Sequence, residues 1–400
     1  MRAMPWGSSS WMRRGMQSGV MAIAALLSAC GGSDSGSGPA DFDVKLPTAV
    51  ATPQRFARIG MGNWHGCMLD AAGAAWCWGS NEHGQLGAAS SQRCQSGNID
   101  CSSTPLQVGG GLGFAAVTAS DLYSCGLTAA GAAWCWGFGL GGQLGDGRNA
   151  NSTLPVAVAG AHAFSFITSS QFTGLSCGVE RDGSTWCWGT GFGFGATGPA
   201  ASSVPLRWNA VSAIAWTRLA LGQGHACGLD AAGHAFCVGS NSFGLLGDGS
   251  DAASTAPVAV AGGRTYRDIA VGIEHSCALA TDGRVWCWGF GAGVGNAGAV
   301  SAIQATPVEV VGNPPFEKIA VSSGRSCGLT ADGQAWCWGS NYGGTLGDGS
   351  TVERPTPGAV GGGHRFQAIA EGGVSTCGIA LDGAAFCWGS NEFGGVGIPF

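Results

Sequence analysis

The sequence predicts an all-β fold, a propeller of seven four-stranded blades. A Cys-x9-Cys unit occurs seven times, the last five units begin 50 residues apart, and Gly supplies 74 of the 400 residues. A fixed period of this size is typical of stacked blades, and abundant glycine suits tight turns between short strands. The repeated pairs are Cys67 and Cys77, Cys125 and Cys135, Cys177 and Cys187, Cys227 and Cys237, Cys277 and Cys287, Cys327 and Cys337, and Cys377 and Cys387.

Each pair of cysteines is expected to face one another across a β-hairpin. In the fifth unit the turn Thr281-Asp282-Gly283 separates two alternating apolar runs, a strong hairpin signal. Counting outward from this turn places Ala278 opposite Trp286 and Cys277 opposite Cys287, at a position where the Cα atoms come close enough for a disulfide. A bridge over so short a loop contributes about 2–3 kcal/mol. The small residue opposite Trp286 is expected to leave room for the indole.

Two further strands complete each unit. Residues 266–271 are predicted to form a strand before the first cysteine, and Pro257-Val258-Ala259-Val260 follows the variable loop of the preceding unit. The chain ends at Phe400 without a Pro-x-x-Val strand for the seventh unit, whereas residues 46–50 supply one before the first unit. We therefore expect residues 46–50 to complete the last blade and close the ring, because an incomplete blade would leave an unpaired edge.

The N-terminus has the features of an export signal. Residues 1–29 contain Arg13 and Arg14, then an apolar run too short to span a bilayer, and end in Leu-Ser-Ala before Cys30. This pattern resembles the lipoprotein cleavage box, in which the cysteine is lipidated; an ordinary secretory signal is the alternative. Residues 30–40 are predicted to be a flexible tether, and residues 41–400 the propeller. The expected location is the bacterial cell envelope, on the outer membrane or cell surface.

Charge and cysteine content agree with export. The net charge is −6, and a chain beginning at residue 30 would carry −9, which disfavours nucleic-acid binding. Without Cys30 the 17 cysteines become 16, the seven framework pairs plus Cys94 and Cys101. An even number in an exported protein predicts that all sixteen form disulfides. A zinc site is disfavoured, because zinc ligands are spaced more closely than Cys-x9-Cys.

The repeats resemble the RCC1 (regulator of chromosome condensation) family. The resemblance rests on residues 275–279 (His-Ser-Cys-Ala-Leu), Asp282-Gly283, Trp288-Gly289 and the Ser-Asn-Glu-His-Gly-Gln-Leu-Gly run over 80–87. It covers about residues 41–400 and implies a seven-bladed propeller. The eukaryotic member that gives the family its name exchanges nucleotide on a small GTPase and binds nucleosomes. No residue of that role can be placed on this sequence, and export would separate the chain from cytosolic GTPases.

Departures from the repeat are where we expect function. Residues 88–103 form the largest insertion, which Cys94 and Cys101 are expected to pin. Residues 189–203 are also irregular. The candidate partner-binding residues of the insertion are Arg93, Gln95, Asn98 and Asp100. Trp64, Trp208 and Trp216 are read as tryptophans outside the repeat and therefore as candidate exposed anchors.

The sequence offers no catalytic, cofactor or metal site. His65, His225 and His275 share one repeat position and are interpreted as structural strand residues, and no paired carboxylates or nucleophile motif stands out. The leading hypothesis is a monomeric, lipid-anchored scaffold, not an enzyme, that binds a protein partner through the loops of one face. The alternatives are a carbohydrate or cell-wall binder, a lyase or hydrolase, and a nucleotide exchange factor.

Overall fold

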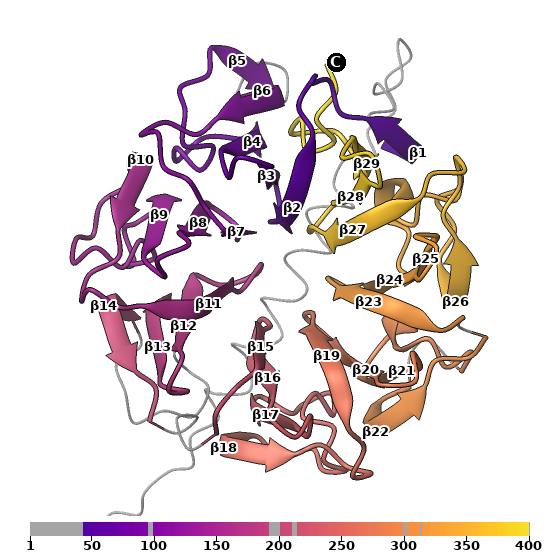
Figure 1. Ribbon diagram of the computed structural model, residues 1–400. Helices are drawn as coiled ribbons and strands as arrows, with labels where there is room; N and C mark the ends of the chain where they lie inside the picture. The colour runs from indigo at the N-terminus through magenta and orange to yellow at the C-terminus, as the bar shows by residue number, and fades with distance from the viewer. Residues whose placement is uncertain are drawn as a thin grey trace, which may run out of the picture. The chain divides into compact units, whose positions relative to one another are not determined.

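A computed structural model describes residues 43–94, 99–191, 201–209, 214–298, 302–312 and 314–399. These residues form seven antiparallel sheets arranged around a central axis, which confirms the predicted seven-bladed propeller (Figure 1). The first strand of each blade lies nearest the axis and the fourth at the rim. Blade 1 has a fifth strand in its insertion.

The strands of blades 1 to 4 are β2 (Phe56–Met61), β3 (His65–Asp70), β4 (Ala75–Ser80), β5 (Gln92–Cys94), β6 (Ile99–Gln107); β7 (Ala116–Ala119), β8 (Tyr123–Leu127), β9 (Ala133–Gly137), β10 (Ser152–Ala157); β11 (Phe164–Ser169), β12 (Leu175–Glu180), β13 (Thr185–Thr190), β14 (Ala201–Arg207); β15 (Arg218–Leu221), β16 (His225–Leu229), β17 (Ala235–Gly239) and β18 (Ser254–Ala259). Those of blades 5 to 7 are β19 (Tyr266–Val271), β20 (His275–Ala280), β21 (Val285–Gly289), β22 (Gln304–Glu309); β23 (Phe316–Val321), β24 (Arg325–Thr330), β25 (Ala335–Gly339), β26 (Arg354–Ala359); β27 (Phe366–Glu371), β28 (Ser375–Ala380), β29 (Ala385–Ser390) and β1 (Asp43–Ala49). Two short 3-10 helices, η1 (Ala292–Val294) and η2 (Tyr342–Gly344), lie in the loops after β21 and β25.

The hairpin register is the one predicted. Cys277 pairs with Cys287 and Ala278 with Trp286, and the turn closes through a 2.8 Å bond from the Ala280 amide to the Arg284 carbonyl. The two cysteine Cα atoms are 4.1 Å apart, as in a non-hydrogen-bonded antiparallel pair.

The same register brings the two cysteines of every blade together. All seven framework pairs have a Cα separation of 4.1 Å and sulfur atoms within bonding distance. In blade order Cys67 is bonded to Cys77, Cys125 to Cys135, Cys177 to Cys187, Cys227 to Cys237, Cys277 to Cys287, Cys327 to Cys337 and Cys377 to Cys387. Each blade therefore has a covalent link between its second and third strands.

The ring closes through the N-terminal strand, as expected. Strand β1 pairs antiparallel with β29, with Thr48 opposite Cys387 and Ala49 opposite Phe386. It begins at Asp43, three residues earlier than predicted, because the sheet pairing continues past an irregularity between Val44 and Thr48. Blade 7 is therefore built from both ends of the propeller sequence.

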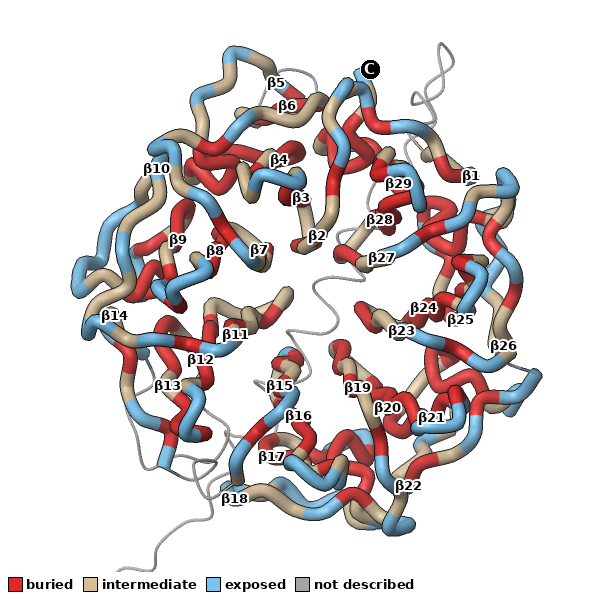
Figure 2. Tube along the Cα trace, viewed as in Figure 1, coloured by how far each residue is buried: buried red, intermediate tan, exposed pale blue. Residues whose placement is uncertain are grey.

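Buried indoles join neighbouring blades. Trp288 is fully buried, and its Nε1 donates a 2.8 Å bond to the Leu245 carbonyl in the loop of the preceding blade. Trp136 and Trp338 make the equivalent bond to Gln85 and Gly293. Figure 2 shows the second and third strands of the blades buried along their length. These bonds fix the loops at one end of the propeller to the blade that follows.

The two ends of the propeller carry different kinds of connection between strands. Loops that join strands 1 to 2 and strands 3 to 4 leave at the same end, because successive strands in each blade are antiparallel; we call this the loop end. The hairpin turns between strands 2 and 3 and the links between blades lie at the other, the turn end. Within the described part of the chain, no helix has the length and hydropathy to span a membrane.

Candidate functional site

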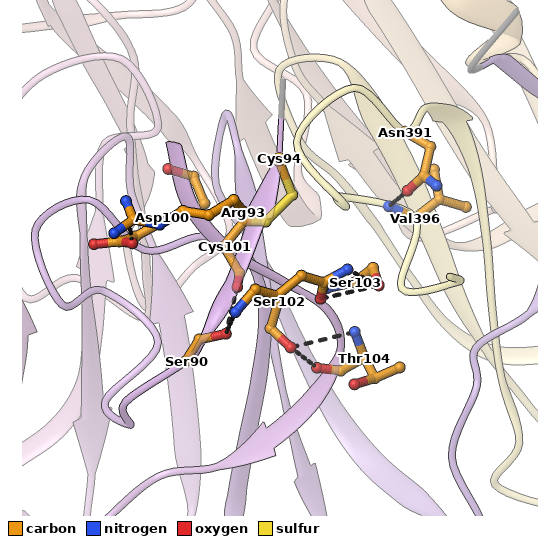
Figure 3. The surroundings of a disulfide bond; sticks show 12 residues. Ser90, Arg93, Cys94, Asp100, Cys101, Ser102, Ser103, Thr104, Asn391 and Val396 are labelled. Carbon is orange, nitrogen blue, oxygen red and sulfur yellow. Dashed lines mark hydrogen bonds and ion pairs between the residues drawn. A yellow bond between two sulfur atoms is a disulfide. The ribbon is translucent and has the colours of Figure 1, made fainter. Parts of the chain in front are cut away.

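The insertion of blade 1 forms a second hairpin at the loop end (Figure 3), and Figure 1 shows it at the rim of the propeller. Cys94 and Cys101 have Cα atoms 5.8 Å apart and bonded sulfur atoms. Arg93 and Asp100 lie opposite one another and form a 2.6 Å ion pair, in which both side chains are about half exposed. Two predicted partner-binding residues thus face solvent together. Gln95, Asn98 and the predicted lipid-bearing Cys30 lie outside the described residues.

This hairpin is held firmly at its base. The Gln92 side chain accepts a 2.8 Å bond from the Ser103 amide and donates a 2.8 Å bond to the Ser103 hydroxyl. The Ser90 hydroxyl donates to the Cys101 carbonyl. The C-terminal segment lies beside the hairpin, since a Cβ added to Gly394 would come within 3.1 Å of Ser103 Cα. The base of the hairpin is therefore fixed to the body of blade 1.

Aromatic side chains meet across several seams between blades at the loop end. Trp64 of blade 1 packs edge-on against Phe393 of blade 7, with ring centroids 4.5 Å apart. Phe243 and Phe290 pair at 5.4 Å between blades 4 and 5. Phe243 and Tyr342 are 37% and 56% exposed. Trp64 therefore belongs to a set of loop-end aromatics, and large apolar side chains on a folded surface mark interaction sites when they gather.

Sequence reasoning missed most of these aromatics, although they follow the repeat. His83, Phe243 and Phe393 each stand three residues after the serine of the Ser-Asn-x-x-Gly motif. Phe138 and Phe290 replace that serine in the next blade, and His83 and Phe138 lie 5.0 Å apart. Aligning the loops after each Trp-Gly or Val-Gly would have shown that partners occupy matching positions in adjacent units.

The expectation that Trp216 is an exposed anchor is wrong. Trp216 is 5% exposed and lies eleven residues before Cys227, where Phe114, Phe316 and other aromatics stand in their own repeats. A Cβ added to Gly228 would come within 2.4 Å of the Trp216 ring. The small residue of the second strand therefore accommodates the aromatic ring at or just before the start of the first strand, not the indole opposite it as we had expected.

Trp208 is also buried, at 7% exposure, which contradicts the second anchor prediction. It ends the motif Pro205-Leu206-Arg207-Trp208, where the other repeats have Pro-x-x-Val. In the next blade Val238 replaces the indole that six of the repeats carry. In other seams these positions are adjacent, since a Cβ on Gly295 would meet both Val310 and Trp338. Trp208 and Val238 share one core cluster, so valine and tryptophan have exchanged places at this seam.

The repeated histidines link one blade to the next. His65, His225 and His275 are buried, and the Nε2 atom of each lies 2.7–2.8 Å from a serine hydroxyl of the following blade. Burial lowers the pKa of His65 and His275 to about 3 and that of His225 to about 4. The rings stay neutral at physiological pH and hold the seams. They are not arranged as metal ligands.

Arginine replaces this histidine in blade 6. Arg325 donates to the carbonyl oxygens of Gly372, Gly373 and Ser375 in blade 7, and its Nε lies 3.9 Å from Glu371 Oε1. Burial raises the pKa of Glu371 to about 8, and the positive charge of Arg325 opposes that rise. Among the described residues, Cys327, Cys337 and Glu371 form a close group, but the two sulfurs are bonded to one another and so cannot bind a metal ion.

A cavity of about 210 Å³ follows the axis between the first strands of blades 3 to 7. Its lining is mostly aliphatic, with Thr168, Ser169, Gln171 and Glu371 as polar members. Gln171 belongs to a loop two residues longer than its counterparts in the other blades. Its Nε2 donates to the carbonyls of Met61 and Glu371, and its Oε1 accepts from Ser322. This one side chain connects four blades at the loop end of the cavity.

Comparisons with known proteins agree with this architecture. The regulator of chromosome condensation (RCC1) repeat matches residues 56–85, 266–292 and 316–345. The human probable E3 ubiquitin-protein ligase HERC3 is 35% identical over 94 residues, which are 23% of this chain and 8% of that protein. The chain therefore spans under a tenth of that relative.

Solved structures resemble the chain in fold. Human WBSCR16 matches with a TM-score of 0.72 at 18% identity, covering 86% of this chain and 90% of that one. Prp20p of Saccharomyces cerevisiae matches with a TM-score of 0.69 at 20% identity, covering 83% and 81%. The structure of Prp20p was described together with its binding to Gsp1p and histones.

Proposed function

Because this chain belongs to the RCC1 repeat family, we propose that it is a protein-binding scaffold whose partner docks on the loop end. The observation that carries the proposal is the gathering there of seam aromatics such as Trp64 and Phe393 beside a hairpin whose base is fixed by a disulfide and hydrogen bonds. A binding surface needs exposed apolar anchors held in place by a stiff frame. The indole bonds between blades and the Gln92–Ser103 contacts supply that stiffness.

Binding of proteins by similar propellers supports the proposal. The structural relative Prp20p binds Gsp1p, and Kap60 was crystallised with the same yeast protein. The carbohydrate alternative relied on exposed aromatics outside the repeat, such as Trp208, and Trp208 is buried. Protein binding is therefore the function that the surface supports best.

The test is affinity capture with a mild crosslinker from the native cell envelope and medium, using the chain tagged at Phe400. We expect one stoichiometric protein, and we expect its yield to fall when Arg93 and Asp100 are replaced together by alanine. The matched control replaces Arg284 and Asp282, an exposed ion pair at the turn end. Capture of no protein, or only of glycan, would refute the scaffold.

We further propose that the scaffold is exported and held at the bacterial outer membrane through a lipid on Cys30. The support is the sequence of residues 1–30 together with sixteen cysteines that pair completely in the described residues. Mass spectrometry of the mature protein tests this. A chain beginning at Cys30 with attached acyl groups is expected, and a Cys30→Ala variant would be released from the membrane fraction. An unmodified mature N-terminus would refute the anchor.

A further inference from the structure

The charges of the propeller are divided unequally between its two ends. The turn end carries ten acidic residues (Asp70, Glu180, Asp182, Asp230, Asp268, Asp282, Glu309, Glu317, Asp332, Asp382) and ten basic residues (Arg55, Arg58, Arg181, Arg207, Arg218, Arg264, Arg267, Arg284, Lys318, Arg365). The loop end carries eleven acidic residues (Asp43, Glu82, Asp100, Asp121, Asp146, Asp248, Asp251, Glu274, Asp348, Glu353, Glu392) and four basic ones (Lys45, Arg93, Arg148, Arg354).

The net charge of the propeller, −7, therefore lies entirely at the loop end. The buried Arg325 and Glu371 belong to neither surface, and the sequence between the described segments adds no charge. An excess of one sign on one face produces a potential that attracts oppositely charged partners and repels like-charged ones. The acidic loop end would repel nucleic acid, lipid phosphate and acidic polypeptides.

Acidic residues adjoin the aromatic pairs of this end in the sequence or in space. Glu392 precedes Phe393, which packs against Trp64. Glu82 precedes His83, which packs against Phe138. In blade 5 the Glu274 carboxylate lies near the residue after Phe290, since a Cβ added to Gly291 would come within 3.8 Å of Glu274 Oε2. The Phe290 ring meets Phe243. An acidic residue thus accompanies an aromatic pair at three seams.

A carboxylate next to an aromatic ring is a recognition site for a guanidinium or ammonium group, which gains both an ion pair and a cation–π contact. The protein uses the ring contact itself at the turn end, where the Arg264 guanidinium lies 3.6 Å from the centroid of the Trp286 ring. The loop-end pairs have the rings and the carboxylates, but the four basic residues of that end are too few to neutralise them.

We propose that the loop end recognises a lysine- and arginine-rich segment of a partner protein. The inference rests on the proposed protein-binding function and adds the chemistry of the partner. Sites at separate seams around the ring favour a chain with several cationic side chains over a single small cation. Electrostatic steering of this kind raises the association rate and makes binding sensitive to salt.

The test titrates the full propeller with a fluorescently labelled peptide of alternating lysine, arginine and serine, and with a glutamate peptide of equal length. The loop-end variant combines Glu82→Gln, Glu274→Gln and Glu392→Gln. The turn-end variant combines Asp282→Asn, Glu309→Gln and Glu317→Gln, and removes the same charge. We expect the basic peptide alone to bind, and the loop-end variant to bind it about tenfold more weakly than wild type.

A Phe393→Ala variant removes one aromatic ring without changing the charge of the loop end. We expect it to bind the basic peptide more weakly than wild type. Melting temperatures of all variants show that the fold is retained. Equal effects of the loop-end and turn-end variants, or no binding of the basic peptide, would overturn the inference. If the loop-end charge variant still captures the cellular partner, the scaffold proposal stands and the basic-segment inference fails; if wild type captures no protein, the scaffold proposal fails whatever the peptide does.

Discussion

The side-chain amide of Gln171 in blade 3 donates a 3.1 Å hydrogen bond to the carbonyl oxygen of Met61 in blade 1, a blade that is not its neighbour in the ring. The same amide also bonds blades 6 and 7. The contact depends on the two extra residues of the blade 3 loop. It fastens the first strands of distant blades together at the loop end of the axial cavity.

Replacing Gln171 by alanine should lower the free energy of unfolding by about 1–3 kcal/mol, because buried partners in three blades lose their bonds. The matched control is Gln223→Ala, which removes an exposed glutamine from the corresponding loop of blade 4. Thermal and denaturant unfolding of both variants measure the difference. Equal stability of the two variants would show that the cross-ring bonds contribute nothing.

The exchange of tryptophan and valine between positions 208 and 238 predicts coupled effects on stability. Trp208→Val should leave a cavity and cost about 2–4 kcal/mol, and Val238→Trp should overpack the seam and cost about 1–3 kcal/mol. The double variant should restore the arrangement of the other seams. A double-mutant cycle should therefore give a favourable coupling energy of at least about 1 kcal/mol, whereas additive losses would contradict the exchange.

The buried histidines predict a loss of stability in acid. Their folded pKa values of about 3 to 4 lie below the unfolded value of 6.5, so the unfolded chain binds more protons between these limits. The contribution of the histidines to stability is complete above pH 6.5 and falls as the pH drops toward 4, by about 1.4 kcal/mol per pH unit for each histidine. Replacing His275 by glutamine should remove about one of the protons taken up on unfolding, and so make the dependence of the unfolding free energy on pH less steep. Denaturant unfolding at several pH values measures this.

The buried Glu371 carboxyl should make the protein less stable as the pH rises, opposite to the effect of the histidines. Its folded pKa of about 8 lies above the unfolded value of 4.5, so its contribution is complete below pH 4.5 and is lost as the pH rises to 8. Glu371→Gln should remove that loss while keeping the side chain beside Arg325. Unfolding of this variant and of the exposed control Glu353→Gln should diverge between pH 4.5 and 8. Parallel profiles would show that Glu371 is ionised in the fold.

Closure by β1 predicts that deletion of residues 41–51 lowers the melting temperature of the whole propeller. The deletion exposes the edge of β29 and removes Val50 from the core between blades 7 and 1. Differential scanning calorimetry measures the change, and a synthetic peptide of residues 41–51 added in excess should recover part of it. An unchanged melting temperature would show that the strand is dispensable.

The paired cysteines predict that the propeller contains no free thiol. Alkylation before reduction should leave the mass of the propeller unchanged, and alkylation after reduction should add sixteen groups. Replacing Cys277 and Cys287 by serine should cost about 2–3 kcal/mol. Uptake of alkylating agent by the unreduced protein would show that some pairs stay open.

The sequence by itself determined the blade count, the hairpin register and the closing strand, because each depends on a period or a local turn. Cys277 faces Cys287 for no reason other than the three-residue turn between them. The tertiary structure decided which aromatics are exposed. Trp208 and Trp216 differ from their repeat neighbours in residue type but occupy the same core positions. Packing between blades decides that Trp208 fills the space that Val238 leaves.

The partition of charge and the role of Gln171 also needed the fold. Acidic residues at the loop end are scattered through the sequence from Asp43 to Glu392, and only the alternation of strand direction gathers them on one face. Gln171 bonds residues more than a hundred positions away, at Met61 and Ser322, because the ring brings the first strands of all blades to one axis. Local sequence patterns determine the strands and turns within each repeat. Contacts between repeats, such as those of Gln171, exist only once the blades are arranged in a ring.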